Sequence, residues 1–154
     1  MKKLLILLSS INILPTLSIL PISCKEQKEY YMQGKSDIDV VELLTPDFII
    51  EKKLKDDYKD TLSRVNNGVS YSHEGTYIDD SIGQKIKLLF KDSNTYPVSS
   101  INSDTKETEE WFFTLRGDKD SVSFELFFVE AVTNKGDKSV ECKTLFSKTI
   151  NISY

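Results

Sequence analysis

Few residues of this chain have the chemistry that catalysis or metal binding requires. The sequence contains one histidine, His73, and two cysteines, Cys24 and Cys142, and no pair among them has the spacing of metal ligands. Asp118 and Asp120 lie in one turn, but calcium prefers about six to eight oxygen ligands. There is no glycine-rich phosphate loop and no serine in a nucleophile elbow. We therefore expect no catalytic residue, no metal and no cofactor, with carboxylate pairs as the one catalytic alternative.

The tripeptide Arg116-Gly117-Asp118 is the motif with the most specific binding chemistry. It lies between two alternating apolar segments, Trp111 to Leu115 and Val122 to Val132, as the turn of a hairpin does. Gly117 permits such a turn, and the flanking side chains would project opposite charges. The tripeptide resembles the RGD motif of integrin-binding adhesins, which implies a host receptor as partner. The alternative is a plain turn, since hairpins favour Gly and Asp for backbone reasons.

Trp111 is a second candidate for binding. It is the only tryptophan, and it follows a long polar stretch, residues 99–110, that we expect to be a loop. An exposed indole in this position could bind a sugar or a peptide. However, Trp111 alternates with Phe113 and Leu115, which is typical of the buried face of a strand. Core packing is therefore the alternative for this residue.

The first 24 residues have the parts of a secretory signal. Lys2 and Lys3 precede an apolar run from Leu4 to Leu20, and the small residue Ser23 precedes Cys24. This arrangement resembles a bacterial lipoprotein signal peptide. The resemblance implies that the chain is cut between Ser23 and Cys24, and that Cys24 carries a diacylglyceryl thioether and acyl chains such as palmitate. It also implies a protein anchored by lipid to the extracellular face of the cell membrane.

An uncleaved membrane anchor and ordinary secretion are the two alternatives for this segment. A spanning helix needs about 20 apolar residues. The run from Leu4 to Leu20 is shorter, contains Ser9 and Asn12, and is interrupted by Pro15. Lipidation at Cys24 is therefore the preferred interpretation.

Residue usage is skewed in a way that is typical of bacteria with AT-rich genomes. Arg64 and Arg116 are the only arginines among 20 basic residues, and Ala131 is the only alanine. Together with the leader, this composition is similar to that of the surface lipoproteins of mollicutes.

The net charge argues against nucleic acid as a partner. The chain has 24 acidic and 20 basic residues and a net charge of −4, and loss of Lys2 and Lys3 with the leader makes it more negative. Binding to phosphate backbones or to anionic headgroups depends on positive charge. Membrane association is therefore expected to depend on the acyl chains.

The composition divides the chain into three parts. Residues 1–23 are the signal peptide, residues 24–36 are a charged, lipidated tether, and residues 37–154 have the length of one globular domain. If Cys24 is acylated, Cys142 has no disulfide partner, so the domain must be stabilised by packing.

One amphipathic helix is predicted near the start of the domain. Thr45 can cap it, Pro46 suits its first position, and Asn66-Asn67-Gly68 can end it. Its apolar stripe comprises Ile50, Leu54, Tyr58, Leu62 and Val65. The preceding residues 37–45 fit either a strand or a short helix.

After Gly68 the apolar period changes from 3.6 to 2, and we expect no further helix. Alternating segments centre on residues 69–73, 86–90, 111–115, 122–128, 140–146 and 150–154. The predicted fold is α+β, with one N-terminal amphipathic helix packed on an antiparallel β-sandwich or open barrel of six to seven strands.

These features predict a non-enzymatic binding or adhesion module on the cell surface. Its lipid would contact the membrane, and a host receptor or another surface protein would contact its loops. A structural coat lipoprotein without a specific ligand and an accessory component of a solute importer are the competing hypotheses.

Overall fold

The computed structural model describes residues 29–59, 63–66, 69–73, 75–97, 99–101 and 107–153. Cys24 and the predicted signal peptide lie outside these residues. The described elements are α1 (Asp37–Leu44), β1 (Ile49–Ile50), β2 (Lys53–Leu54), β3 (Ser63–Asn66), β4 (Val69–Ser72), β5 (Thr76–Tyr77), α2 (Asp80–Lys87), β6 (Ser99–Ile101), β7 (Thr108–Arg116), β8 (Ser123–Thr133) and β9 (Val140–Asn151). The α+β class is confirmed.

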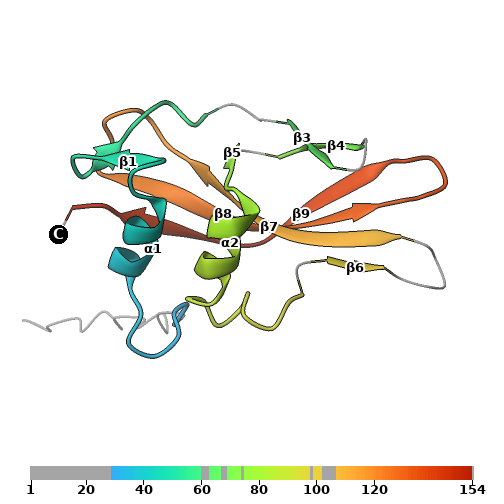
Figure 1. Ribbon diagram of the computed structural model, residues 1–154, viewed down its shortest axis with the longest axis horizontal. Helices are drawn as coiled ribbons and strands as arrows, with labels where there is room; N and C mark the ends of the chain where they lie inside the picture. The colour runs from blue at the N-terminus through green and yellow to red at the C-terminus, as the bar shows by residue number, and fades with distance from the viewer. Residues whose placement is uncertain are drawn as a thin grey trace, which may run out of the picture.

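Three long antiparallel strands, β7, β8 and β9, form the middle and one edge of a five-stranded sheet (Figure 1). The other side of β7 pairs with β5 at one end and with β6 at the other. The remaining described strands form two separate hairpins, β1–β2 and β3–β4. A sandwich or open barrel of six to seven strands is therefore not confirmed.

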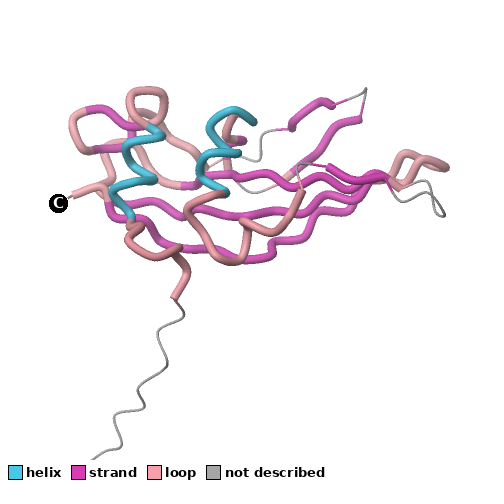
Figure 2. The backbone as a smooth tube through the Cα atoms, turned by 60° about the horizontal axis from the view of Figure 1, so that its bottom comes forward, coloured by secondary structure: helices cyan, strands magenta, loops and turns pink. Residues whose placement is uncertain are grey.

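Both helices lie side by side on one face of the sheet (Figure 2). Helix α1 contacts α2 and β9, and α2 contacts β7. The alternating pattern of the strands explains this face, because every second side chain of a strand points the same way. The buried side chains of this core include Val40, Leu44, Ile86, Phe90, Phe113, Leu115, Leu126, Phe128, Phe146 and Ile150.

The opposite face of the sheet has a smaller apolar cluster. Phe112, Val129 and Ala131 are buried there. Strand β4 contacts β9, and His73, which follows β4, has its Nε2 atom 3.1 Å from Oγ1 of Thr144. The hairpin β3–β4 thus lies against this second face.

The predicted helix over residues 45–66 is wrong. Glu51 and Lys52 have φ values of 50° and 60°, and they form the two-residue turn between β1 and β2. The backbone of this segment bonds across the molecule, with Leu54 N–H donating to Ser121 C=O at 3.0 Å. Leu54 and Tyr58 are buried as the stripe predicted, but on extended chain. Tertiary pairing has overridden the helical period.

The helices lie in segments whose patterns were ambiguous or suggested strands. Ser36 begins α1 with a capping box, in which the Asp39 carboxylate accepts from the Ser36 N–H at 2.9 Å. Asp79 begins α2 by accepting from the Ser81 N–H at 2.9 Å. The strand predicted over residues 86–90 is wrong, because it covers the last turn of α2 and leaves Leu88 62% exposed.

The segment predicted as a tether is partly folded onto the domain. Tyr31 pairs with Phe90, Met32 N–H donates to Leu89 C=O at 2.8 Å, and Tyr30 C=O accepts from Lys91 N–H at 2.9 Å. The chain therefore contacts the domain from Glu29 onward, earlier than the expected boundary at residue 37.

Candidate functional site

The Arg116-Gly117-Asp118 motif lies where β7 ends, and a hairpin connection of residues 117–122 leads from it into β8. The predicted position between two paired strands is confirmed, since Arg116 is opposite Glu125 in the β7–β8 register. Arg116 is exposed at the end of its strand.

Gly117 is required here by lack of space. Its N–H and C=O pair with Tyr58, at N···O distances of 3.2 and 2.8 Å. A Cβ atom on Gly117 would lie 2.4 Å from Cδ1 of Leu54 and 3.2 Å from Cβ of Phe124. Glycines with positive φ in the described chain are Gly34 and Gly75, so the expected reason, backbone freedom in a turn, does not apply at Gly117.

Asp118 forms an ion pair with Lys59. The side chains of Asp118 and Lys59 are 62% and 58% exposed, so the pair contributes little to stability. The next residue, Lys119, donates its N–H to the Asp57 carboxylate at 2.8 Å. These two contacts add to the Gly117–Tyr58 backbone pairing that holds the loop against the segment before β3, and Asp118 can exchange Lys59 for another cation at small cost.

Two adjoining clefts flank the exposed end of the sheet. The loop cleft, about 510 Å³, is lined by Lys59, Arg116, Gly117, Asp118, Ser121, Ser123, Phe124, Glu125 and Thr149. The edge cleft, about 690 Å³, is lined by Glu29, Tyr30, Tyr31, Met32, Gly34, Lys35, Glu125, Ser147, Lys148 and Thr149. Glu125 and Thr149 line both clefts. Volumes of this size lie in the usual range of ligand sites.

The register of the sheet explains why the two clefts adjoin. Arg116 is opposite Glu125, and Glu125 is opposite Thr149, so the three residues form one row across β7, β8 and β9. All three are exposed. Their side chains point away from the helices, because their neighbours Leu115 and Leu126 are in the helix-covered core.

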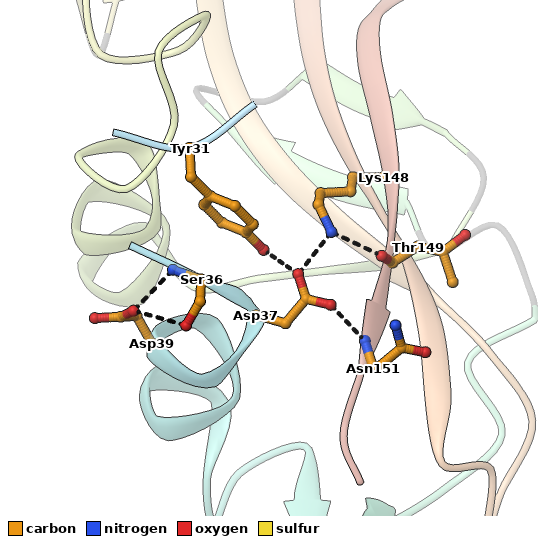
Figure 3. A network of polar contacts seen from close by, with 7 residues as sticks. All are labelled: Tyr31, Ser36, Asp37, Asp39, Lys148, Thr149 and Asn151. Carbon is orange, nitrogen blue, oxygen red and sulfur yellow. Dashed lines mark hydrogen bonds and ion pairs between the residues drawn. The ribbon is translucent and has the colours of Figure 1, made fainter. Parts of the chain in front are cut away.

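A polar network around Asp37 includes three residues that line the edge cleft, Tyr31, Lys148 and Thr149 (Figure 3). One carboxylate oxygen, Oδ1, accepts from the Tyr31 hydroxyl at 2.5 Å and from the Lys148 ammonium at 2.6 Å. The other, Oδ2, accepts from the Asn151 N–H at 2.9 Å. The Lys148 ammonium also lies 5.0 Å from the centroid of the Tyr31 ring and donates to Thr149 C=O at 3.1 Å.

The Asp37 carboxylate is stabilised in its charged form. It is 8% exposed, and burial alone raises the pKa of a carboxyl. The hydrogen bonds from Lys148, Tyr31 and Asn151 outweigh burial and hold the pKa of Asp37 below its ordinary value. Sequence reasoning missed this network, although the acidic first turn after Ser36 is a recognisable signal of a helix start.

Trp111 is not placed as a binding platform. It is 6% exposed, and its ring centroid lies 5.6 Å from that of Tyr96. Its Nε1 has no hydrogen-bond partner among the residues that the structure describes. The core-packing alternative fits this position.

The side chains of His73 and Cys142 lie on the face of the sheet opposite the helices. The ring nitrogens of His73 lie 3.1 Å from Oγ1 of Thr144 and 3.5 Å from Oγ1 of Thr114. Burial raises the pKa of the Cys142 thiol, which disfavours the reactive thiolate.

In the described part of the chain, no three His, Cys, Asp or Glu residues are grouped as metal ligands. Nor does that part contain a helix with the length and apolar character needed to cross a bilayer. Comparisons with models of protein families, with curated proteins and with solved structures found no match.

Proposed function

We propose that this chain is a lipoprotein anchored by Cys24 to the extracellular face of a bacterial cell membrane, and that its domain is a non-enzymatic binding or adhesion module. The observation that carries the binding proposal is the pair of adjoining clefts that share Glu125 and Thr149. The anchor proposal rests on the signal pattern that ends in Cys24.

The position of the first described residues supports a membrane-proximal domain. Glu29 forms an ion pair with Lys91 and lines the edge cleft. Five residues of extended chain span at most about 18 Å, so Cys24 lies within that reach of Glu29. Two or more acyl chains on Cys24 would hold the domain firmly at the bilayer.

For the fold, we propose that hairpin β3–β4 adds a sandwich-like layer to the second face of the sheet. The support is the contact of β4 with β9 and the apolar cluster of Phe112, Val129 and Ala131 on that face. Such a layer leaves the exposed row of Arg116, Glu125 and Thr149 at the end of the sheet as the binding surface.

The anchor is tested by Cys24→Ser, with Cys142→Ser as the matched control. The Cys24→Ser chain should appear in the medium or persist as an uncleaved precursor, and it should leave the detergent phase on partitioning. Cys142→Ser should still enter the detergent phase. Mature protein with an unmodified Cys24, identified from the mass of its N-terminal peptide, would exclude the lipoprotein assignment.

The adhesion role is tested at the Asp118–Lys59 pair. If a receptor binds Asp118, Asp118→Glu should weaken attachment of the protein to host cells, because the longer side chain displaces the carboxylate. Lys59→Ala should leave attachment equal or stronger, because it removes the cation that competes for Asp118.

A competing RGD peptide supplies an independent control for the same assay. Attachment that both variants and the peptide leave unchanged would make Arg116-Gly117-Asp118 a turn only, and the binding role would then rest on the other residues of the clefts. A chain that attaches to nothing would instead favour the structural coat lipoprotein.

A further inference from the structure

The outer edge of β9 presents backbone groups to the edge cleft. Asn151 N–H points away from β8, because it donates to Asp37, and Ile152 N–H points toward β8, because it donates to Val122 C=O at 2.8 Å. The β8–β9 register is continuous from residue 151 back to Phe146. Since hydrogen-bonded and non-hydrogen-bonded pairs alternate in antiparallel strands, the N–H and C=O groups of Thr149 and Ser147 also point outward.

Three of these outward groups are available for pairing. Thr149 C=O accepts from Lys148, and Asn151 N–H is bonded to Asp37. Ser147 N–H, Ser147 C=O and Thr149 N–H have no hydrogen-bond partner in the part of the chain that the structure describes. The bulge between Phe128 and Val129 shifts the register beyond Phe146, so the available row is short.

The backbone groups on the other side of the sheet, along β7, are partly paired with other segments. There β7 pairs with β6 at residues 108–110 and with β5 at residues 114–115, and Gly117, just past its end, pairs with Tyr58. Uncovered strand edges are templates for another strand, and proteins usually block them. At Ser147 and Thr149 the described chain leaves a cleft of about 690 Å³ instead, bounded on its far side by Glu29 to Lys35.

The charge of the cleft specifies one feature of its occupant. Lys148 is bound by Asp37, Lys35 by Asp39, and Glu29 by Lys91. Glu125 lies in the same cleft, is exposed, and has no ion-pair partner among the described residues. Glu125 is on β8 and opposite Thr149, one strand in from the edge, so a long basic side chain of a ligand paired with Ser147 and Thr149 can reach this carboxylate across Thr149.

We propose that the edge cleft binds an extended peptide segment, which adds as a strand to β9 at Ser147 and Thr149 and places a Lys or Arg side chain against Glu125. This inference rests on the proposed binding function and names its ligand class. Main-chain hydrogen bonds supply affinity in this mode of recognition, and the side chains that alternate along the peptide supply selectivity.

The test selects a displayed library of random eight-residue peptides on the full chain in detergent micelles. Enriched peptides should carry a basic residue among β-formers. Ser147→Pro should weaken their binding at least about tenfold, because proline lacks the N–H but is tolerated where an edge strand faces solvent. Ser147→Ala keeps the N–H and should bind as the parent chain does. Glu125→Gln should weaken peptides that have the basic residue.

N-methylation of the peptide backbone tests the same contact on the unaltered chain, so the result does not depend on the folding of Ser147→Pro. Methylation at the paired positions should abolish binding, and methylation at alternate positions should be tolerated. Failure to enrich any peptide, or equal binding by Ser147→Pro and the parent chain, overturns the inference.

These outcomes separate the inference from the proposed function. If the peptides bind Arg116→Ala more weakly than the parent chain but bind Ser147→Pro equally well, strand addition is overturned. The chain would then be a binding module that uses the loop cleft. A chain that selects no peptide and attaches to no host cell would overturn both.

Discussion

Asp37 and Lys148 lie 111 residues apart in the sequence, yet a 2.6 Å ion pair joins the first turn of α1 to the edge strand β9. Tyr31, from the segment that enters the domain, donates to the same carboxylate oxygen. One buried carboxylate therefore connects the N-terminal segment, the first helix and the edge of the sheet.

Replacing Asp37 with Asn should destabilise the domain by about 2 kcal/mol, because the substitution removes the charge that two part-buried hydrogen bonds and the ion pair complement. Urea unfolding measures the change. Lys35→Ala is the control, since its ion pair with Asp39 is more exposed and should contribute less than about 1 kcal/mol. Equal effects of the two substitutions would contradict the assigned role of Asp37.

Protonation of Asp37 should lower the stability of the domain in acid. The folded-state pKa of Asp37 is below its ordinary value of 3.8, so the unfolded chain binds more protons in that range. The contribution of Asp37 is complete above pH 3.8 and is lost as the pH falls through the lowered folded-state value. The gap in unfolding free energy between the parent chain and Asp37→Asn should therefore be smaller at pH 3 than at pH 7. A difference in unfolding free energy between the two chains that is larger at pH 3 than at pH 7 would contradict this prediction.

Gly117→Ala should destabilise the domain by about 1 to 3 kcal/mol, because the added methyl group overlaps Leu54, which is 1% exposed and cannot move aside. Gly83→Ala is the matched control. Gly83 lies in helix α2, and an added Cβ would have its nearest contact 3.9 Å away, at the carbonyl oxygen of Ile78. The substitution should therefore stabilise the domain by about 0.5 to 1 kcal/mol. Thermal melts of the two variants should shift in opposite directions.

The strands β7 and β8 could be predicted from the sequence because their side chains alternate between a core face and a second face. Residues 111–115 and 122–128 both fall within observed strands or directly beside them. In these segments the local period and the burial of the folded protein agree, which is the condition under which pattern reasoning succeeds.

The first helix was misplaced because residues 45–66 have a helical period but pair across the molecule. Leu54 bonds with residues 120 and 121, and Tyr58 with Gly117. Helix α2 was missed because Ile86, Leu88 and Phe90 alternate, although Ile82 and Ile86 also have helical spacing and Asp79 is a capping residue.

The candidate site was only partly accessible to sequence reasoning. Arg116 and Asp118 were identified, but their neighbours Glu125 and Thr149 were not, because that adjacency depends on the register of three strands. A bulge between Phe128 and Val129 alters the β8–β9 register farther along, and no sequence pattern indicated it.

Leu126→Ala should destabilise the domain by about 2 to 5 kcal/mol, since Leu126 is completely buried between the sheet and the helices. Leu88→Ala should change stability by less than about 0.5 kcal/mol, because Leu88 is 62% exposed at the end of α2. Denaturant midpoints of the two variants give the comparison. A large loss from Leu88→Ala would instead support the strand that the sequence suggested for residues 86–90.

If Cys24 carries the proposed lipid, the attachment of the chain to the domain at Glu29 would keep the edge cleft close to the bilayer. Glu29 lines this cleft, and five residues of extended chain, at most about 18 Å, separate it from Cys24, the residue proposed to carry the lipid. The turn between β8 and β9 lies at the opposite end of the long axis (Figure 1). In the proposed lipid-anchored protein, a narrow, linear peptide would therefore reach the edge cleft more easily than a bulky folded partner would.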